Sequence, residues 1–276
     1  MLDQITPIIL TYNEAANIRR TLQQLRWAKD IVVVDSFSDD ATVEIVAQLP
    51  QARVFQRRFD THEKQWNYAL KETNIITDWV LALDADYVLT PEVVEEIKAL
   101  SPDRSVSGYT SKFIYCVHGK RLRGSAYPPV TVLYRRERAT YRQDGHTQRV
   151  VIDGEVRELR SPILHDDRKP LSRWFASQQK YAKLEADQLL RTPPASLRRP
   201  DKIRLMAWPS PILIFLYTLL AKGCILDGWS GWFYVLQRTL AETMIAIELV
   251  DRRLRASSIE STQDAGAQTA TSRNRR

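Results

Sequence analysis

Residues 79–87 read Trp-Val-Leu-Ala-Leu-Asp-Ala-Asp-Tyr, an apolar run that ends in two carboxylates, Asp84 and Asp86. The run is short, branched and aromatic, which predicts a buried strand. In an open α/β sheet, ligands bind just beyond the carboxyl ends of the strands. Two acids held so close together favour a positive partner, such as a divalent metal that carries phosphates. A polar strand end or a helix cap is the alternative, and the neighbouring segments must decide.

Strand and helix patterns alternate on both sides of this run. Short branched runs predict strands over residues 5–10, 31–34, 52–55 and 78–83. Amphipathic spacing and capping residues predict helices over 15–28, 41–48 and 62–74, and another that begins at Thr90-Pro91. This alternation favours an α/β fold with a mostly parallel sheet, helices on both of its faces and right-handed crossovers.

The pattern changes beyond residue 105. Strands are predicted over 106–117 and 129–135, and a hairpin over 148–164 around Asp153-Gly154. Helices are predicted over 171–191 and 230–254, and the polar composition of 256–276 predicts disorder. We therefore expect a first domain over 1–168 with halves that meet near residue 100, a helical region over 169–255 and a disordered tail over 256–276.

The composition narrows the class of partner. A formal net charge of +7 and a pI near 9.4 favour phosphates, anionic lipid heads or nucleic acid. The basic residues are scattered and no aromatic-interleaved RNA motif occurs, so nucleic acid is not expected. Two cysteines suggest neither a disulfide framework nor a zinc site, and they suit a reducing cytoplasm. The first residues lack the charged and apolar regions of a signal peptide.

An apolar stretch over 205–221 follows the basic segment 198–204 and is broken by Pro209-Ser210-Pro211. It is too short and too interrupted for a transmembrane helix, which needs about 20 apolar residues. We expect an interfacial or re-entrant element whose basic flank meets anionic lipid heads, on the inner face of the cell membrane. The alternatives are that these helices pack on the core or form a dimer face, which would give a homo-oligomer.

Acidic side chains follow three predicted strands. Glu14 follows the first, Asp35 the second, and Asp84 with Asp86 the fourth. Because these ends share one edge of the sheet, a nucleotide could lie across it, with carboxylates on its hydroxyls and a metal on its diphosphate. No glycine-rich phosphate loop of either common type occurs, which argues against a dehydrogenase and a P-loop ATPase.

Three motifs together resemble the family 2 glycosyltransferases of the GT-A fold: Thr11-Tyr12-Asn13-Glu14, Val33-Val34-Asp35-Ser36 and Asp84-Ala85-Asp86. The resemblance implies a Rossmann-like mixed sheet, with residues 1–100 as the nucleotide-binding half and 101–168 as the acceptor half. It implies donor contacts around the nucleotide and sugar, and a metal, Mg²⁺ or Mn²⁺, on Asp86. The implied donor-binding residues are Thr11, Tyr12, Glu14, Asp35, Lys64 and Asp84. For Lys64, a solvated helix charge is the equal alternative.

The later chain resembles the lipopolysaccharide-core glucosyltransferase branch of that family, more loosely. Its motifs are Tyr134-Arg135-Arg136, Gly145-His146-Thr147-Gln148-Arg149-Val150, Ile163-Leu164-His165 and Ile225-Leu226-Asp227-Gly228. In the wider fold a C-terminal histidine often completes the metal shell, which makes His165 the first choice here. Its imidazole suits Mn²⁺ better than Mg²⁺. The alternative is a hydrogen-bonded loop histidine without a metal. Arg168 and Lys169 could bind the diphosphate or a phosphorylated acceptor.

The general base is left open by one departure from the family. Many relatives carry a His-Glu pair where this chain has Thr147-Gln148, and an amide cannot accept a proton at useful pH. The remaining candidates are Asp144, His146, Asp166 and Asp167. Asp144 could equally be a turn former in its Gln-Asp-Gly sequence.

The resemblance implies an inverting hexosyltransferase that uses a nucleotide-diphosphate sugar, a UDP-sugar first, and a hydroxyl acceptor on a glycan or glycolipid. Metal and basic groups would stabilise the leaving group while a base takes the acceptor proton. One rival is a haloacid-dehalogenase-like phosphatase with Asp84 as nucleophile, although that motif usually lies on the first strand of its domain. The other rival is a non-enzymatic binder of membrane or nucleic acid.

Overall fold

The computed structural model describes the backbone of residues 1–144 and 147–273, and the side chains of residues 1–142 and 148–257. Its chain forms two compact units. The first comprises Met1–Leu171 with Lys222–Tyr234, and the second comprises Ser172–Ala221 with the chain from Val235 onward. The long segment of the first unit ends at Leu171, near the boundary predicted at 168. Residues 222–234, which the prediction placed in the helical region, belong to the first unit.

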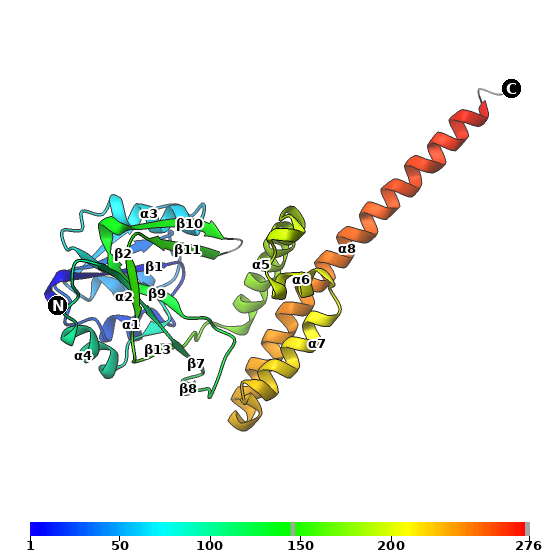
Figure 1. Cartoon of the computed structure of the whole chain (residues 1–276). Coiled ribbons are helices and arrows are strands. Elements are labelled where there is room, and N and C mark those ends of the chain that lie inside the picture. The colour runs from blue at the N-terminus through cyan, green and yellow to red at the C-terminus, as the bar shows by residue number, and fades with distance from the viewer. Residues whose placement is uncertain (145–146, 274–276) are drawn as a thin grey trace. The chain divides into compact units, whose positions relative to one another are not determined.

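A seven-stranded mixed sheet forms the centre of the first unit (Figure 1). Its strand order is β12 (Glu155–Glu158), β6 (Val106–Ser111), β9 (Val130–Arg135), β4 (Trp79–Asp84), β1 (Ile5–Thr11), β2 (Ile31–Asp35) and β3 (Ala52–Gln56). Strands β4, β1, β2 and β3 are parallel, whereas β9 is antiparallel to both β4 and β6. The four strands predicted from residues 5–83 therefore form the parallel half of the sheet.

Both faces of the parallel half are buried. Ile9, Val33 and Leu81 pack into a core with helices α1 (Ile18–Gln23), α2 (Thr42–Ala47) and α4 (Pro91–Ala99). Alternate residues of the same strands, such as Ile8 and Val32, pack on the other face with α3 (His62–Lys71) and the hairpin of β10 (Ala139–Asp144) and β11 (Thr147–Ile152). Successive side chains of a strand point to opposite faces, and both faces are buried here. These strands therefore have continuous apolar sequences.

Helix α4 begins as its sequence predicts. The Thr90 hydroxyl accepts a hydrogen bond from the Val93 backbone N–H, and Pro91 is the first helical residue. Helix α1 is shorter than the predicted 15–28, because residues 14–17 form a turn in which the Glu14 carbonyl accepts the N–H groups of Asn17 and Ile18. That turn carries part of the site described below.

The predicted hairpin around Asp153-Gly154 is wrong. Residues 148–152 belong to β11, which pairs antiparallel with β10, whereas β12 crosses to the central sheet and pairs parallel with β6. Gly154 makes this crossing with a φ of +123°, and a Cβ there would lie 2.2 Å from the Ser107 hydroxyl oxygen. The Asp-Gly signal therefore marked a close backbone approach between two sheets rather than a hairpin turn.

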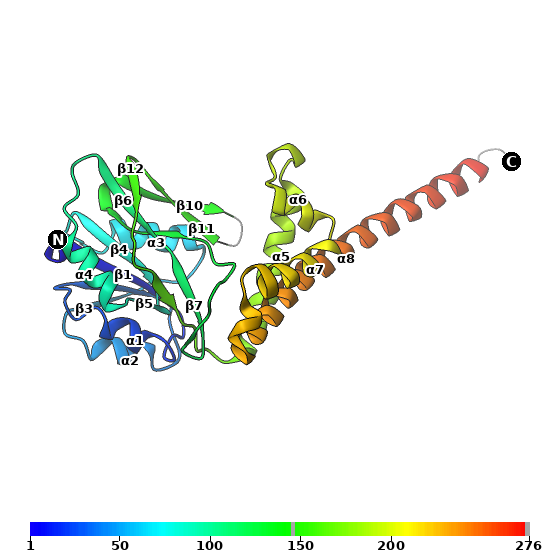
Figure 2. The same ribbon diagram turned by 60° about the horizontal axis from the view of Figure 1, so that its bottom comes forward.

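A four-stranded sheet lies beside the central one (Figure 2). Its order is β5 (Tyr87–Val88), β13 (Ile163–His165), β7 (Phe113–Val117) and β8 (Lys120–Arg121). Strand β13 brings His165 opposite Tyr87 of β5, although 78 residues separate the two in the chain. The 222–234 segment is tied to this unit because the Arg123 N–H and the Lys120 ammonium bond Asp227, and the Tyr234 hydroxyl accepts the Ala126 N–H.

The second unit is helical. It contains α5 (Leu171–Arg191) from Ser172, α6 (Arg199–Leu205), α7 (Pro209–Leu216) with a π-helical turn over Tyr217–Ala221, and α8 (Trp229–Arg273) from Val235. Among the described residues, no helix is both long and apolar enough to cross a membrane. Helix α8 continues to Arg273, in place of the disorder predicted from 256. A polar composition prevents burial, but it does not prevent extension of a helix already nucleated upstream.

Candidate active site

The acidic strand ends lie side by side as the sequence predicts. Thr11 at the end of β1 is in register with Asp35 of β2, and Leu10 with Asp84 of β4. Asp35 is completely buried and its carboxylate accepts three hydrogen bonds, from the Thr11 hydroxyl at 2.8 Å and from the Ser38 N–H and hydroxyl at 2.9 and 2.5 Å. Asp35 therefore fixes the loop after β2 against the end of β1.

Asp86 and His165 meet just beyond this edge. The His165 Nε2 lies 3.2 Å from the Asp86 Oδ2, although 79 residues separate them in sequence. Burial disfavours both charges, but the pair attraction dominates: the pKa of Asp86 is lowered and that of His165 is raised. The Asp86 Oδ1 and the His165 Nδ1 are both buried, and neither has a hydrogen-bond partner among the residues whose side chains are described. A buried acceptor without a partner is costly and points to a missing ligand.

Asp84 has a different environment from Asp86. Burial, and next the negative charge of Asp86, raise the pKa of Asp84 to about 6. Three aromatic rings surround His165, with centroid separations of 5.4 Å to Tyr87, 4.8 Å to Tyr115 and 4.5 Å to Tyr127. These rings orient the imidazole, and the sequence did not reveal them because they come from three separate segments.

The donor groups around Asp86 suit a divalent cation. Asp86 offers a free carboxylate oxygen and His165 an imidazole, a pair that Mn²⁺ accepts well. Within the part of the chain whose side chains are described, no group of three His, Cys, Asp or Glu residues could hold a metal alone. Diphosphate or water oxygens would have to complete the coordination shell.

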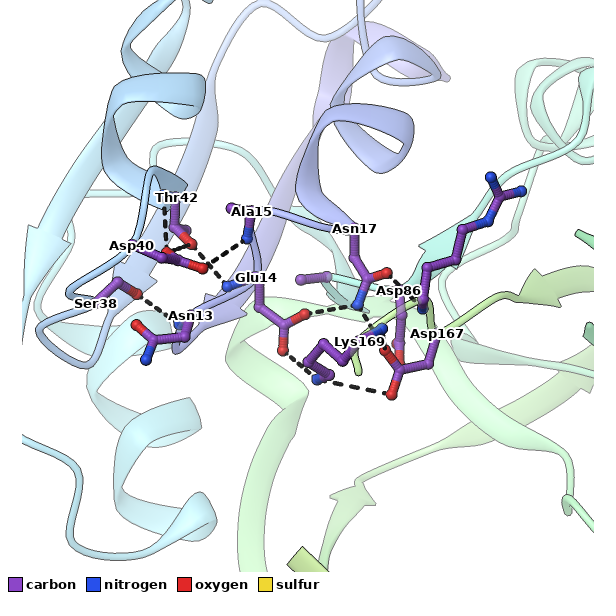
Figure 3. A network of polar contacts seen from close by, with 12 residues as sticks. Asn13, Glu14, Ala15, Asn17, Ser38, Asp40, Thr42, Asp86, Asp167 and Lys169 are labelled. Carbon is purple, nitrogen blue, oxygen red and sulfur yellow. Dashed lines mark hydrogen bonds and ion pairs between the residues drawn. The ribbon is translucent and has the colours of Figure 1, made fainter. Parts of the chain in front are cut away.

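Glu14 belongs to a partly buried polar network that joins the β1–α1 turn to the loop after β13 (Figure 3). Its carboxylate accepts the Lys169 ammonium at 2.6 Å and the Asn17 side-chain amide at 2.9 Å. Burial raises the pKa of Glu14 to about 7, although the Lys169 charge opposes that shift. Lys169, predicted as a phosphate ligand, is thus paired with a predicted donor ligand.

Asp166 and Asp167, two of the predicted bases, hold this loop in place. The buried Asp166 carboxylate accepts the Gly119 N–H at 3.1 Å and the Arg168 Nε at 3.0 Å, and Arg20 lies 3.6 Å away. The Asp167 Oδ1 accepts the Asn17 amide and the Lys169 N–H at 2.8 and 3.0 Å. The side chain of Asp144, at the end of β10, and all of His146 lie outside the described residues.

Helix α3 presents a residue other than the predicted one. Lys64 is 63% exposed in its side chain and pairs with Asp60 at 3.4 Å. Its neighbour Gln65 is buried, and its amide donates to the Ser36 hydroxyl and accepts from Arg57 at 2.5 Å. Gln65 thus supports the loop after Asp35, a role that a glutamine in a helical pattern does not signal. Tyr12 is half-exposed at the end of β1.

Comparison with known proteins agrees with this arrangement. The family model for glycosyl transferase family 2 matches residues 6–155, which include all three acidic strand ends. The chain belongs to this family. It is 25% identical over 265 residues to the lipopolysaccharide core biosynthesis glycosyltransferase LpsC of Rhizobium meliloti, covering 90% of this chain and 92% of LpsC.

One further sequence relative and one solved structure show how far the similarity extends. An uncharacterized glycosyltransferase of Rickettsia felis is 34% identical over 109 residues, which are 39% of this chain and only 38% of that protein's length. The crystal structure of S. aureus TarS 1–349 in complex with UDP superposes with a TM-score of 0.50 at 16% identity, over 92% of both chains. At that identity the likeness shows the GT-A fold alone.

Family membership removes the phosphatase interpretation of Asp84. The position of the Asp84-Ala85-Asp86 motif points the same way, because it follows the fourth strand along the chain, whereas the phosphatase motif usually lies on the first. It likewise sets aside a purely non-enzymatic binder, since the matched family is one of glycosyltransferases.

Proposed function

We propose that this protein is an inverting hexosyltransferase that moves a sugar from a nucleotide diphosphate, a UDP-sugar first, to a hydroxyl of a membrane-linked glycan or glycolipid. The observation that carries the proposal is the buried Asp86 Oδ1, which has no partner in the described part of the chain and lies beside His165 at the carboxyl edge of the sheet. TarS binds UDP and LpsC serves lipopolysaccharide core biosynthesis, which supports the donor and the acceptor class.

The proposed donor site runs along the ends of β1, β2 and β4. Asp35 and Thr11 hold the loop that would face the nucleotide, with Tyr12 exposed beside them. Asp86 and His165 would hold Mg²⁺ or Mn²⁺, which neutralises charge on the departing diphosphate when bound. Asp84 would orient the sugar, and its raised pKa lets it act as a hydrogen-bond donor below about pH 6.

Inversion requires a base on the face of the sugar opposite the leaving group. As the acceptor oxygen forms its bond to the anomeric carbon, the bond to the diphosphate oxygen breaks and the hydroxyl proton passes to the base. Asp166 and Asp167 are already engaged with Gly119, Arg168, Asn17 and Lys169. We therefore assign them a positioning role and the proton transfer to Asp144 or His146.

The experiment is a panel of nucleotide sugars with and without Mn²⁺, followed by thermal shift. The right donor should raise the melting temperature only with metal, by mass action. Slow hydrolysis of that donor, followed by NMR, should release the sugar with its anomeric configuration inverted. No shift with any nucleotide sugar, or release of a retained anomer, would contradict the proposal. The cellular setting that we propose is the cytoplasmic face of the cell membrane, with the protein bound peripherally.

A further inference from the structure

The segment over residues 205–221 in the second unit contains no charged residue among its seventeen. It forms helix α7 and the π-helical turn that follows. Its large side chains face outward: Trp208 is 71% exposed, Ile212 53%, Leu216 45% and Leu220 59%. These four residues recur every four positions and so lie along one side of the helix. We call Trp208, Ile212, Leu213, Leu216 and Leu220 the α7 ridge.

The inward side of the same segment carries polar groups beside the buried apolar residues Ala207 and Leu219. The buried Ser210 hydroxyl donates to the Glu242 carboxylate of α8 at 2.7 Å, and the Arg204 guanidinium bonds Glu242 at 2.6 Å. Thr218 is also buried, and its hydroxyl bonds the Ile214 carbonyl. A helix on a water surface has the opposite arrangement, with its apolar side inward. An outer side of large apolar residues, with the hydroxyls of Ser210 and Thr218 turned inward, suits an apolar surrounding.

The length of the element sets its depth. Residues 209–221 are thirteen, which at 1.5 Å each give a helix of roughly 20 Å, short of the 30 Å of a bilayer core. The ridge would therefore enter one leaflet without crossing it. Trp208 directly precedes α7 and Tyr217 directly follows it, and both side chains favour the boundary between lipid tails and head groups.

Cations precede the ridge in the chain. Arg198, Arg199 and Lys202 are exposed on α6 and the residue before it. Among the side chains that the structure describes, Arg198 alone of the three has an acidic partner, Asp201 at 3.3 Å. The core of a protein interface is depleted in charge, whereas a basic rim around an apolar element matches acidic lipid heads. We propose that the α7 ridge inserts into one leaflet of a membrane that contains anionic lipid, with the 198–202 cations on its head groups.

This inference rests on the proposed function in one respect, since a lipid-linked acceptor gives the contact its use. The contact itself is tested without catalysis. The full chain is mixed with phosphatidylcholine vesicles, with or without phosphatidylglycerol, and floated on a density gradient. The variants are Leu216→Asp for the ridge, Arg199→Glu with Lys202→Glu for the rim, and Ile76→Asp as a control. Ile76 is 91% exposed in a loop of the first unit.

The unaltered chain and Ile76→Asp should float with anionic vesicles. Leu216→Asp should lose about tenfold or more of that binding, because a charge enters hydrocarbon. The rim variant should lose the preference for phosphatidylglycerol and keep weak binding to neutral vesicles. Nucleotide-sugar hydrolysis in solution should be the same in all four proteins, so absent turnover would count against the proposed function and leave this result intact.

Two outcomes would overturn the inference. One is failure of the unaltered chain to float with either vesicle. The other is a stable dimer in analytical ultracentrifugation that Leu216→Asp dissociates while flotation is unaffected, which would make the ridge a face between two copies of this chain. Circular dichroism of Leu216→Asp checks that α7 and α8 remain helical.

Discussion

The end of β4 and the loop after β13 both contain buried acids, and they are bonded in opposite ways. They are neighbours, because the Asp166 N–H donates to the Asp86 carbonyl at 3.0 Å. Each carboxylate oxygen of Asp166 accepts a hydrogen bond. In Asp86, the Oδ2 contacts His165, whereas the Oδ1 has no partner among the described residues. A satisfied buried acid supports the scaffold, and an unsatisfied one is kept for a ligand.

The largest expected effect follows from replacing Asp86. Asp86→Asn should reduce metal-dependent turnover of the donor by about a hundredfold or more, since an amide is a poor metal ligand. It should lower the free energy of unfolding only slightly, because the lost attraction to His165 is partly offset by removal of a buried carboxylate oxygen that has no partner among the described residues. Steady-state kinetics with Mn²⁺ and urea unfolding without metal measure the two quantities.

Asp166→Asn should show the opposite profile. It breaks the contacts to Arg168 and Arg20 and leaves those cations facing an amide, so unfolding should become easier by about 3 kcal/mol. Activity per folded molecule should change far less than in Asp86→Asn. The matched control is Asp153→Asn, because Asp153 pairs with Arg138 on the surface. This substitution should change the free energy of unfolding by no more than about 0.5 kcal/mol. If Asp166→Asn and Asp86→Asn had the same free energy of unfolding, the proposed difference between the two acids would be wrong.

Much of the edge with Asp86 could be predicted from the sequence, because local patterns determine it. Branched runs place Thr11, Asp35 and Asp84 at strand ends, and the parallel registers bring those ends together. The Thr90-Pro91 helix start is also local, since its cap is made three residues away. The assignment of family 2 used the order of these motifs, which the family match over 6–155 confirms.

The loop after β13 could not be predicted, because its partners are distant in sequence. Asn17 bonds Asp167 across 150 residues, and nothing in the local sequence of either residue signals it. Chemical type alone predicts Asp166 and Asp167 as candidate bases, whereas the hydrogen bonds that occupy their carboxylates come from distant residues. The Asp153-Gly154 signal failed for the same reason: the position of β12 depends on its pairing with β6.

Glu14 links the two regions and should give a pH dependence. Its pKa is raised by burial from 4.5 to about 7, so between those values the folded state holds a proton that the unfolded state has released. Stability from this group is therefore lost as pH rises through that window, by up to about 3 kcal/mol. Glu14→Gln should lack that part of the slope in urea unfolding from pH 4.5 to 7. A slope identical to that of the unaltered chain would show that Glu14 ionises normally.

Asn67 tests how the hairpin that carries Asp144 is held. Its side chain bonds both the N–H and the carbonyl of Tyr141, each at 3.0 Å, and Trp66 stacks on the Tyr141 ring. Asn67→Ala should lower the free energy of unfolding by about 1 to 2 kcal/mol and lower kcat more than it raises the donor KM. Asn67→Asp keeps the bond from the Tyr141 N–H and should recover part of kcat. A change in donor KM alone would place the hairpin on the donor side.

The smallest effect on activity should come from replacing Lys64. The sequence predicts a donor contact for this residue, but its side chain is exposed. If Lys64 meets a phosphate, Lys64→Ala should raise the donor KM by less than about tenfold at unchanged kcat, and high salt should reduce the difference. Lys71→Ala, another exposed lysine of α3, is the control and should have no effect. Identical KM values in both variants would leave Lys64 as the partner of Asp60 alone.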